Sequence, residues 1–400
     1  MHYRWMIFRK VGEKEQMSTT GLTEQTFAEM IAENGGRLFR TGACVRDSLL
    51  GIRTKQIDFT VVGLVKKNFK LLFPQAKESG TPFPVFYLMV DGIRSEVAFA
   101  RTEQKTDDGQ IRISAKPKVG IEADLLRRDT TINAMAKDSL TGQIIDPYQG
   151  QMAIKAKVLK ATSPAFINDP LNALHLAGQA AQFGFTIEAD TLVLARTVQN
   201  DLRQLPYPKM LPELVTVMSE APEPSRFFKV LKELSLLSAV CAELAALPMD
   251  KFSASMLGLD AVANISQTPK VRFAALGFAL TADDFAAWSA RMSLPADWVD
   301  AASTFSEGIR ILVQRRPADF VDMLLKLRRG ALDAAEFDLI TQAVAFDIPP
   351  LQEFKDMMTL PKGEVVPPEL KGTEIRAWVK MKQVEAVAKK MQSLIEKKVE

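Results

Sequence analysis

The hydrophobic pattern of this 400-residue chain changes near residue 165, and that change limits its fold more than any other feature. Between residues 37 and about 160, short β-type runs alternate with turn signals and helical stretches. These runs are 56–62, 85–90 and 94–99. From about residue 165 onward almost every segment has the 3.6-residue period of a helix, with breaks at prolines near 206, 222, 295, 349 and 367. The pattern predicts an α+β (mixed α/β) head domain followed by an all-α half.

A chain of this length, 47% hydrophobic, can bury two to four separate cores. We therefore expect an N-terminal extension at 1–36, a head domain at 37–162, a helical neck at 163–240 and a helical body and tail at 241–400. Within the extension, residues 20–36 should form a helix that begins after Thr23 and ends at a Gly-Gly pair.

The charge balance does not identify a partner. The chain has 51 Lys and Arg against 48 Asp and Glu, so its formal net charge of +3 is too small to indicate nucleic-acid binding by itself. The last 30 residues should form a helix that carries eight Lys or Arg side chains. Such a run is usually a solvated face, although it could also contact an RNA backbone.

Cysteine and histidine are scarce enough to exclude several kinds of site. Cys44 and Cys241 lie far apart and in no C-x-x-C spacing, which argues against a disulfide framework or a cysteine zinc site and fits a reducing cytoplasm. His2 and His175 cannot build a centre that needs two or more clustered histidines. No apolar run reaches the roughly 18 residues that span a bilayer, and residues 1–17 lack the apolar core of a signal peptide. We expect a cytoplasmic protein without a membrane segment.

A turn of small residues precedes a predicted helix at residues 42–51. Gly42 and Ala43 follow a predicted strand, so backbone N–H groups there could approach a triphosphate. Arg46 would supply a planar guanidinium, and Asp47 would orient it or cap the helix. Taken alone, a Gly-Ala turn before a helix is more often only a turn.

Acidic residues on two predicted strands indicate a candidate metal site. Nucleotidyl transfer uses two carboxylates at positions i and i+2 of one strand, which point the same way and hold two Mg²⁺ ions. Here the pattern is Gln56-Ile57-Asp58, so only one carboxylate is present. Glu96, on a later strand, is the candidate for a further acidic group, although alone it would pass for an edge-strand surface charge.

The segment 124–136 carries an unusual density of polar residues inside an apolar run. Arg127, Arg128, Asp129 and Asn133 have helix-compatible spacing and suit a triphosphate, a ribose hydroxyl and internal bracing. The string R-R-D-T-T-I-N-A resembles the R-R-D-x-T-I-N-A motif of the class II tRNA nucleotidyltransferases and bacterial poly(A) polymerases. Because this motif is long and specific, the chain is identified as a member of that family.

The resemblance extends over about residues 38 to 395. The segment 42–51 is similar to the family's phosphate-binding turn, and residues 55–59 fall at its D-x-D metal motif. Further similar stretches are 145–150, 157–160, 163–171, 227–231, 271–276 and 370–376. The resemblance implies a head with a five-stranded nucleotidyltransferase sheet. It then implies a helical neck at 163–240 that binds nucleotide and RNA, followed by a helical body and tail. A degenerate phosphohydrolase-derived bundle would occupy about 241–365.

The resemblance also implies a reaction: Mg²⁺-assisted addition of C or A, from CTP and ATP, to the tRNA 3′ end at the acceptor stem. The implied catalytic and metal-binding residues are Asp58 and Glu96, with Gln56 at the position of a lost aspartate. The implied nucleotide-binding residues are Gly42, Ala43, Arg46, Asp47, Arg101, Arg127, Arg128, Asp129, Asn133, Asp169 and Asn172.

Several positions depart from the family pattern. Gln56 brings no negative charge to magnesium, so metal binding should be weaker. The family's E-D-x-x-R helix, whose Asp and Arg pair with the base of CTP or ATP, appears here as Asn168, Asp169 and Asn172. The arginine expected one turn later is His175. These changes remove charge-assisted bonds that would select the nucleotide.

Two further departures lie downstream. An E-R-x-x-x-E pattern appears as Pro208-Lys209, with only Glu213 retained. The family's phosphohydrolase His-Asp pair falls on Gly277-Phe278, and no histidine follows residue 175. Phosphohydrolase activity is therefore excluded.

Three interpretations stay open: an impaired CCA-adding tRNA nucleotidyltransferase, a catalytically inactive tRNA- or RNA-binding paralogue, and a scaffold whose partner uses the helical half. The retained arginines and Asp58 favour nucleotide binding. Gln56 distinguishes best between these interpretations, because only the enzyme interpretation must explain a glutamine at the position of a metal-binding aspartate. We favour impaired or absent CCA addition.

Overall fold

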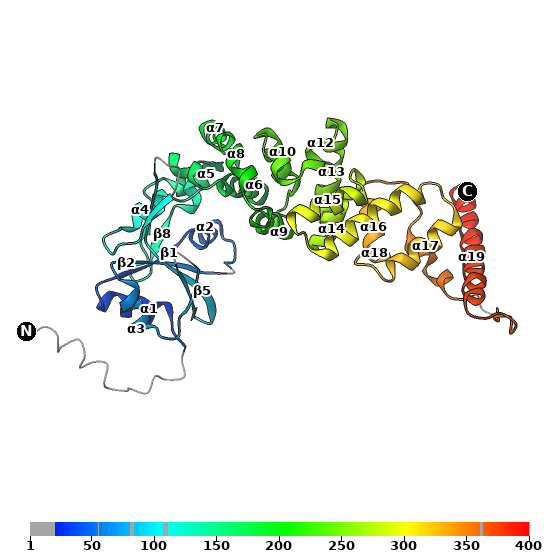
Figure 1. Ribbon diagram of the computed structural model, residues 1–400, viewed down its shortest axis with the longest axis horizontal. Coiled ribbons are helices and arrows are strands. Elements are labelled where there is room, and N and C mark those ends of the chain that lie inside the picture. Colours follow the sequence, from blue (N-terminus) through cyan, green and yellow to red (C-terminus); the bar gives the residue numbers. More distant parts are fainter. Residues whose placement is uncertain (1–20, 55, 81–83, 107–110, 361–362, 400) are drawn as a thin grey trace, which may run out of the picture. The chain divides into compact units, whose positions relative to one another are not determined.

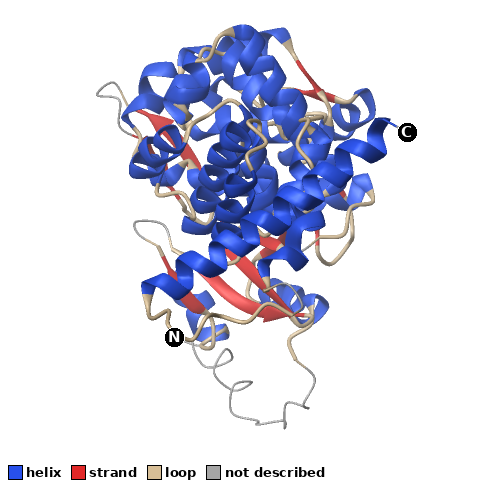
Figure 2. Cartoon of the chain, turned by 90° about the vertical axis from the view of Figure 1, so that its right-hand side faces the viewer, coloured by secondary structure: helices blue, strands red, loops and turns tan. Residues whose placement is uncertain are grey.

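The computed structural model describes residues 21–54, 56–80, 84–106, 111–360 and 363–399, so the first 20 residues of the expected extension lie outside the described part. The chain divides into two compact units, Met1–Asn168 and Asp169–Glu400, which are described separately (Figure 1). The N-terminal unit contains the main sheet, and the C-terminal unit consists almost wholly of helices (Figure 2). The expected fold class, an α+β head followed by a helical half, is confirmed.

A seven-stranded mixed sheet organises the N-terminal unit. Its spatial order is β3 (Lys77–Ser79), β4 (Val85–Val90), β5 (Ile93–Phe99), β2 (Asp58–Val62), β1 (Arg37–Thr41), β8 (Ala136–Asp138) and β9 (Ile144–Ile145). Strands β2 and β5 are parallel, and the other neighbours are antiparallel. The implied number of five strands was too small, because the short strands β3 and β9 extend the two edges.

The first described helix, α1 (Glu24–Glu33), begins where the sequence predicted. The Thr23 hydroxyl accepts a hydrogen bond from the Thr26 N–H at 3.1 Å, which satisfies a donor that the first turn leaves open. Phe27, Ala28 and Ile31 recur on one face of α1 and are buried. This face belongs to the same hydrophobic cluster as the inner side of the sheet.

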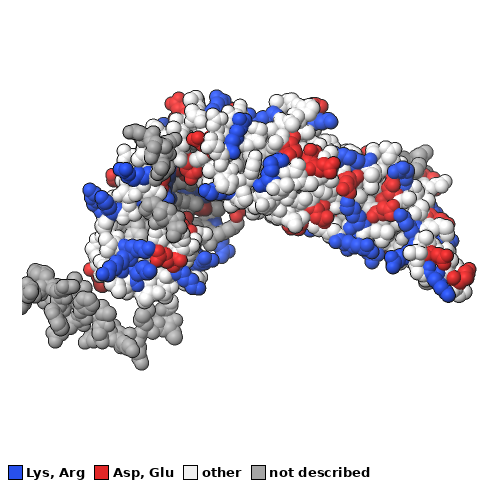
Figure 3. Space-filling model, in the orientation of Figure 1, with Lys and Arg blue, Asp and Glu red and all other residues white. Residues whose placement is uncertain are grey.

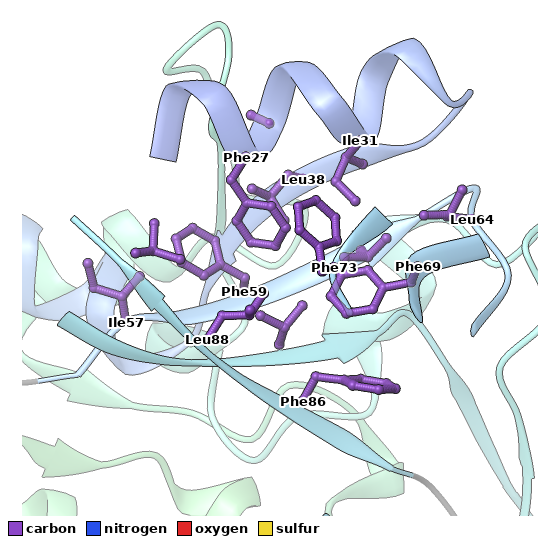
Figure 4. Close-up of a cluster of buried hydrophobic side chains, with 14 of the residues drawn as sticks. Phe27, Ile31, Leu38, Ile57, Phe59, Leu64, Phe69, Phe73, Phe86 and Leu88 are labelled. Atoms are coloured by element: carbon purple, nitrogen blue, oxygen red, sulfur yellow. The ribbon is translucent and has the colours of Figure 1, made fainter. Parts of the chain in front are cut away.

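Aromatic side chains form the centre of that cluster (Figure 4). The ring of Phe27 meets Phe59 of β2 edge-on at a centroid distance of 5.5 Å and Phe73 at 4.9 Å. Phe73 follows α3 (Lys66–Leu72), whose own Phe69 is also fully buried. Helices α1 and α3 therefore cover the same face of the sheet, and α1, which precedes the boundary expected at residue 37, contributes to the head core.

The remaining elements of the N-terminal unit include four of the candidate site residues, Ala43, Arg46, Asp47 and Asn133. A separate hairpin is formed by β6 (Thr102–Lys105) and β7 (Ile111–Ser114). The others are α2 (Ala43–Leu50), α4 (Ile121–Leu126), the 3-10 helix η1 (Thr131–Asn133), α5 (Gly150–Ala156), β10 (Val158–Leu159) and the 3-10 helix η2 (Pro164–Asn168).

The C-terminal unit is a succession of helices broken at the predicted prolines. Pro206 precedes η3 and Pro295 precedes α16. The elements are α6 (Leu171–Phe183), β11 (Thr186–Ile187), α7 (Ala189–Thr197), α8 (Gln199–Gln204), η3 (Tyr207–Lys209), α9 (Leu211–Glu220), α10 (Ser225–Glu233), α11 (Leu237–Val240), α12 (Ala242–Ala246), α13 (Met249–Ile265), α14 (Pro269–Ala274), η4 (Ala275–Phe278), α15 (Ala282–Met292), α16 (Ala296–Leu312), α17 (Pro317–Leu327), α18 (Ala334–Ala343), η5 (Leu351–Met358) and α19 (Thr373–Val399). Across the described residues, none of these helices is both long and apolar enough to cross a membrane.

A buried arginine ties three of these helices together. Arg272 of α14 is 1% exposed and donates to the carbonyl oxygens of Met218 and Ala221 at the end of α9, at 3.2 and 3.0 Å. It also donates to the carbonyl oxygens of Ala263 and Ser266 at the end of α13, at 3.1 and 2.7 Å. Arg272 thus satisfies carbonyl groups that two helix ends leave without intrahelical partners.

The C-terminal helix α19 is present as predicted, and three of its lysines are already in ion pairs. The pairs are Lys380 with Asp322 at 2.6 Å, Lys382 with Glu364 at 3.3 Å and Lys390 with Glu353 at 3.0 Å. On the face shown in Figure 3, positive and negative side chains are interleaved over the helical unit. These lysines therefore do not form an uninterrupted positive stripe.

Replacing Phe27 with alanine should destabilise the N-terminal unit by about 3–5 kcal/mol, because it removes a fully buried ring and leaves a cavity against Phe59 and Phe73. Urea unfolding followed by circular dichroism would measure the loss. Glu33→Ala on the exposed side of α1 is the matched control and should change stability by less than about 0.5 kcal/mol. Equal stabilities of the two variants would show that α1 is not part of this core.

Candidate active site

Two carboxylates lie side by side where β2 begins. The parallel register of β2 and β5 pairs Asp58 with Glu96. The next residues, Phe59 and Val97, belong to the buried aromatic cluster, so the two carboxylates share the opposite face of the sheet. Burial raises the pKa of Asp58, and burial together with repulsion from Asp58 raises the pKa of Glu96. The pair is therefore a concentration of negative charge that suits a hard divalent cation.

Gln56 lies just before β2, which begins at Asp58 rather than at the predicted residue 56. Its side-chain Nε2 donates a hydrogen bond to Asp58 Oδ1 at 3.0 Å. An amide that donates to this carboxylate competes with a cation for the same oxygen and adds no negative charge. The described residues contain no group of three or more acidic, cysteine or histidine side chains that could hold a metal ion.

The predicted small-residue turn is present between β1 and α2. Gly42 has a φ of +73°, and a Cβ there would lie 2.7 Å from Nη1 of Arg128. Only glycine allows both this backbone conformation and the close passage of the guanidinium. Ala43 is the exposed first residue of α2. The turn thus brings the strand end, the helix start and Arg128 together.

A chain of polar contacts braces this turn. Arg46, 6% exposed, donates to Asp47 Oδ1 at 2.7 and 2.9 Å and to Asn133 Oδ1 at 2.7 Å. Asn133 in turn donates to both carboxylate oxygens of Asp129 at 3.1 Å. The predicted residues therefore do meet, and in this structure the Arg46 guanidinium serves as an internal brace.

The spacing of polar residues in the R-R-D segment is compatible with one helix, but the segment does not form one. Helix α4 ends at Leu126, and only the short 3-10 turn η1 follows. The chain leaves the helical path because Thr131 N–H donates to the carbonyl oxygen of Lys160 at 2.8 Å and Thr162 N–H donates to that of Asp129 at 3.0 Å. These long-range backbone bonds replace those that a continuous helix would make.

Three arginines gather around two carboxylates at the end of α4. Asp124, 0% exposed, accepts hydrogen bonds from Arg127 at 2.9 and 3.0 Å and from Arg128 at 3.2 Å. Glu103 of β6 accepts from Arg101 at 3.0 Å and from Arg127 at 3.4 Å. Burial, followed by repulsion from Arg127, lowers the pKa of Arg101. Asp124 and Glu103 were not among the predicted site residues, although the spacing of Asp124 three and four residues before the arginines was a usable signal.

The remaining candidates, Asp169 and Asn172, belong to the C-terminal unit. Asp169 Oδ1 accepts from the N–H of Leu171 at 3.0 Å, and Asn172 on α6 is 8% exposed. No residue of α6 is Lys or Arg. The retained Glu213 of α9 packs directly against Gly178 and lies 3.8 Å from Nε2 of His175. The face of α6 where the resemblance implies arginines therefore carries no fixed positive charge.

The position of the implied His-Asp pair is closed by packing. Gly277 lies in η4, and a Cβ there would lie 2.8 Å from the carbonyl oxygen of Ala302 and 3.1 Å from the backbone nitrogen of Ser306. Both atoms belong to α16. A histidine at residue 277 would need these backbones to separate.

Comparison with known proteins gives matches along most of the chain. Residues 38–160 match the family described as "Poly A polymerase head domain". A protein of Pseudomonas putida named "CCA-adding enzyme" is 34% identical over 68% of this chain and 72% of its own length. A "Multifunctional CCA protein" of Hahella chejuensis is 34% identical over 60% of this chain, which spans 59% of that relative's length.

Solved structures share the fold. The Thermotoga maritima CCA-adding enzyme complexed with tRNA is similar over 93% of this chain and 94% of its own, with a TM-score of 0.66. The sequence identity is 18%, so the likeness shows a common fold and carries no further argument about residues.

Replacing Glu96 with glutamine should raise the melting temperature of the metal-free protein at pH 7.5 by about 2 °C. The change is small because solvent screens the charge of the Glu96 carboxylate. Burial, together with repulsion from Asp58, raises the pKa of Glu96 in the folded protein above its ordinary value of 4.5, so the ionised carboxylate costs stability above that pH. The cost grows as the pH rises through the folded pKa and is absent below the unfolded pKa. Thermal unfolding between pH 4 and 8 would measure this. Glu33→Gln, at an exposed position, is the control variant. A difference in melting temperature between Glu96→Gln and the wild type that does not vary with pH would contradict a raised pKa for Glu96.

Proposed function

Because the chain belongs to the class II tRNA nucleotidyltransferase family, we propose that it binds CTP, ATP and the 3′ end of tRNA and that its nucleotide addition is impaired. The observation that carries the proposal is the pairing of Asp58 with Glu96 beside the arginine cluster, with the amide of Gln56 on Asp58. The carboxylates support nucleotidyl transfer, and the amide accounts for the impairment. The tRNA substrate implies a cytoplasmic location.

Magnesium fits the carboxylate pair. Asp58 and Glu96 would hold it, because the two carboxylates lie side by side on one face of the sheet. Burial raises the pKa of both, and repulsion from Asp58 raises that of Glu96 further, so a cation between them would relieve this repulsion. When bound, the ion would supply positive charge to the reacting phosphate and activate the ribose 3′-hydroxyl. The protein's own contribution is to hold the triphosphate with Arg101, Arg127 and Arg128, while Gly42 leaves room for Arg128.

Gln56 weakens this arrangement in two ways. It removes one of two carboxylates that would hold two ions, so electrostatic attraction for the second ion falls. It also occupies Asp58 Oδ1 with an N–H donor, which must rotate away before a cation binds there. Removing one hydrogen-bond donor that stabilises a transition state costs about 10²–10³ in rate, and we expect a reduction of about 10² from the lost carboxylate.

Nucleotide selection should be weak as well. In the proposed neck, 163–240, Asn172 and His175 stand where the resemblance implies arginines, and Glu213 faces Gly178. An asparagine lacks the planar charged fork that binds a base edge through two parallel bonds. We therefore propose that Asp169 and Asn172 bind the base with little discrimination between CTP and ATP.

We propose that the neck, 163–240, contacts the RNA and that the body and tail, 241–400, have no phosphohydrolase chemistry. The backbone of α16 packs against Gly277 closely enough to oppose a histidine side chain there, and a metal hydrolase needs such ligands. The alternative function, a tRNA-binding protein without turnover, is favoured by the same losses in metal and base contacts. Such a protein would recognise the acceptor stem by its shape and backbone charge.

Incorporation of labelled CTP and ATP into tRNA lacking its CCA end, with Mg²⁺, tests the proposal. The wild type should be slow, and the double variant Gln56→Asp, Asn172→Arg should be at least about tenfold faster, equivalent to about 1.4 kcal/mol of barrier. Adding Asp58→Asn to the double variant is the control and should abolish the gain.

Each other outcome has a definite meaning. A fast wild type that Gln56→Asp does not improve would contradict the impairment assigned to Gln56. Inactivity of every variant, with tRNA binding intact, would replace the enzyme proposal with the RNA-binding alternative.

A further inference from the structure

The arginine cluster already contains two carboxylates, whereas a site that only binds an anion would need none. Arg101, Arg127 and Arg128 come from the end of β5 and the end of α4, and two carboxylates, Asp124 and Glu103, lie among them. The two carboxylates differ in burial: the side chain of Asp124 is 1% exposed, and that of Glu103 is 17% exposed. They also accept hydrogen bonds from different groups, which indicates different roles.

Asp124 accepts hydrogen bonds from all three arginine residues of the cluster. Its Oδ1 accepts from Nε and Nη2 of Arg127 and from the backbone N–H of Arg101, and its Oδ2 accepts from Nη2 of Arg128. The two nearby arginines outweigh burial, and the pKa of Asp124 is lowered below its ordinary value. Asp124 is thus ionised in the folded protein and fixes three arginine residues at once.

Arg128 depends on Asp124 for its position more than Arg101 and Arg127 do, because those two also contact Glu103. Its buried Nε has no hydrogen-bond partner in the described part of the chain. Its Nη1 passes over Gly42, and its charge stabilises the ionised form of Asp58. The bond from Nη2 to Asp124 is therefore the contact that fixes the guanidinium between the turn and the carboxylate pair.

Glu103 binds differently. One oxygen, Oε1, accepts from Nε of Arg101 and from Nη1 of Arg127, and so bridges two guanidiniums that repel each other. A phosphate oxygen could make the same two charge-assisted bonds. The 3.4 Å bond to Arg127 is long, and the Glu103 side chain is the more exposed of the two carboxylates. Both features favour displacement by a competing anion.

We propose that Asp124 is a positioning residue that aims Arg127 and Arg128, and that Glu103 is an internal anion whose place a triphosphate takes on binding. The inference rests on the proposed nucleotide-binding function. It predicts effects of opposite sign for the two carboxylates, because one organises the cation site and the other competes for it. A loss of packing alone would weaken binding in both cases.

The test is the affinity for CTP and for inorganic tripolyphosphate, measured by titration calorimetry without divalent metal so that the arginines are probed alone. Asp124→Asn should weaken both ligands at least about tenfold, since it frees Arg128 from its anchor. Glu103→Gln should tighten both about threefold, because one competing charge is removed.

Asp138→Asn is the matched control. Asp138 is also buried, with a lowered pKa, and accepts from Arg37 at 2.7 Å and from the N–H groups of Leu140 and Thr141. It lies outside the cluster, so its loss should reduce thermal stability about as much as that of Asp124 and leave affinity unchanged.

The outcomes separate this inference from the function on which it rests. A wild type that binds neither ligand would overturn the nucleotide-binding proposal and the inference with it. A wild type that binds, with Asp124→Asn equal to it, would overturn the positioning role alone. If Asp124→Asn does not fold, Glu103→Gln decides: tighter binding supports the inference, and unchanged or weaker binding overturns it.

Discussion

The parallel register of β2 with β5 is the constraint on which the candidate site depends. Side chains alternate along a strand, so the register that buries Phe59 and Val97 also places Asp58 beside Glu96 on the other face. A slip by one residue would drive two carboxylates into the aromatic cluster that α1 and α3 cover. The hydrophobic core therefore enforces the close approach of two like charges, which a cation could then use.

The electrostatics around this pair explain how Gln56 can be tolerated. Asp58 and Glu96 already repel each other, and a third carboxylate would increase the cost of the ion-free state. The Gln56 amide instead donates to Asp58 and stabilises its charge without a metal. In the proposed function, Gln56 thus favours the stability of the ion-free protein over affinity for the ion, which is a conflict between stability and function.

The helical unit shows how a fold survives when implied chemistry is lost. Its stability comes from buried apolar faces and from contacts such as those of Arg272 with the ends of α9 and α13. Gly277 is itself buried against α16, so the residue at this position has become part of the packing. The architecture therefore stays in place without the implied phosphohydrolase residues.

The sequence by itself determined the local structure and the family. The Thr23 cap, the β-type runs, the turn at Gly42 and the helical second half all followed from periodicity and turn chemistry, because these depend on neighbours a few residues away. The R-R-D-T-T-I-N-A string, with its context, was enough to identify the relatives. Gln56 could also be recognised as a departure from the sequence alone.

Tertiary structure decided the contacts between distant segments. The end of α4 at Leu126 depends on backbone bonds to residues 160 and 162, the edge strands β3 and β9 depend on pairing partners, and the roles of Asp124 and Glu103 depend on how β6 lies beside α4. The distance from Gly178 to Glu213 is likewise set by the packing of α6 on α9. Burial and charge pairing across such separations arise only when the chain is folded, because no local pattern records which distant group will lie within hydrogen-bond reach.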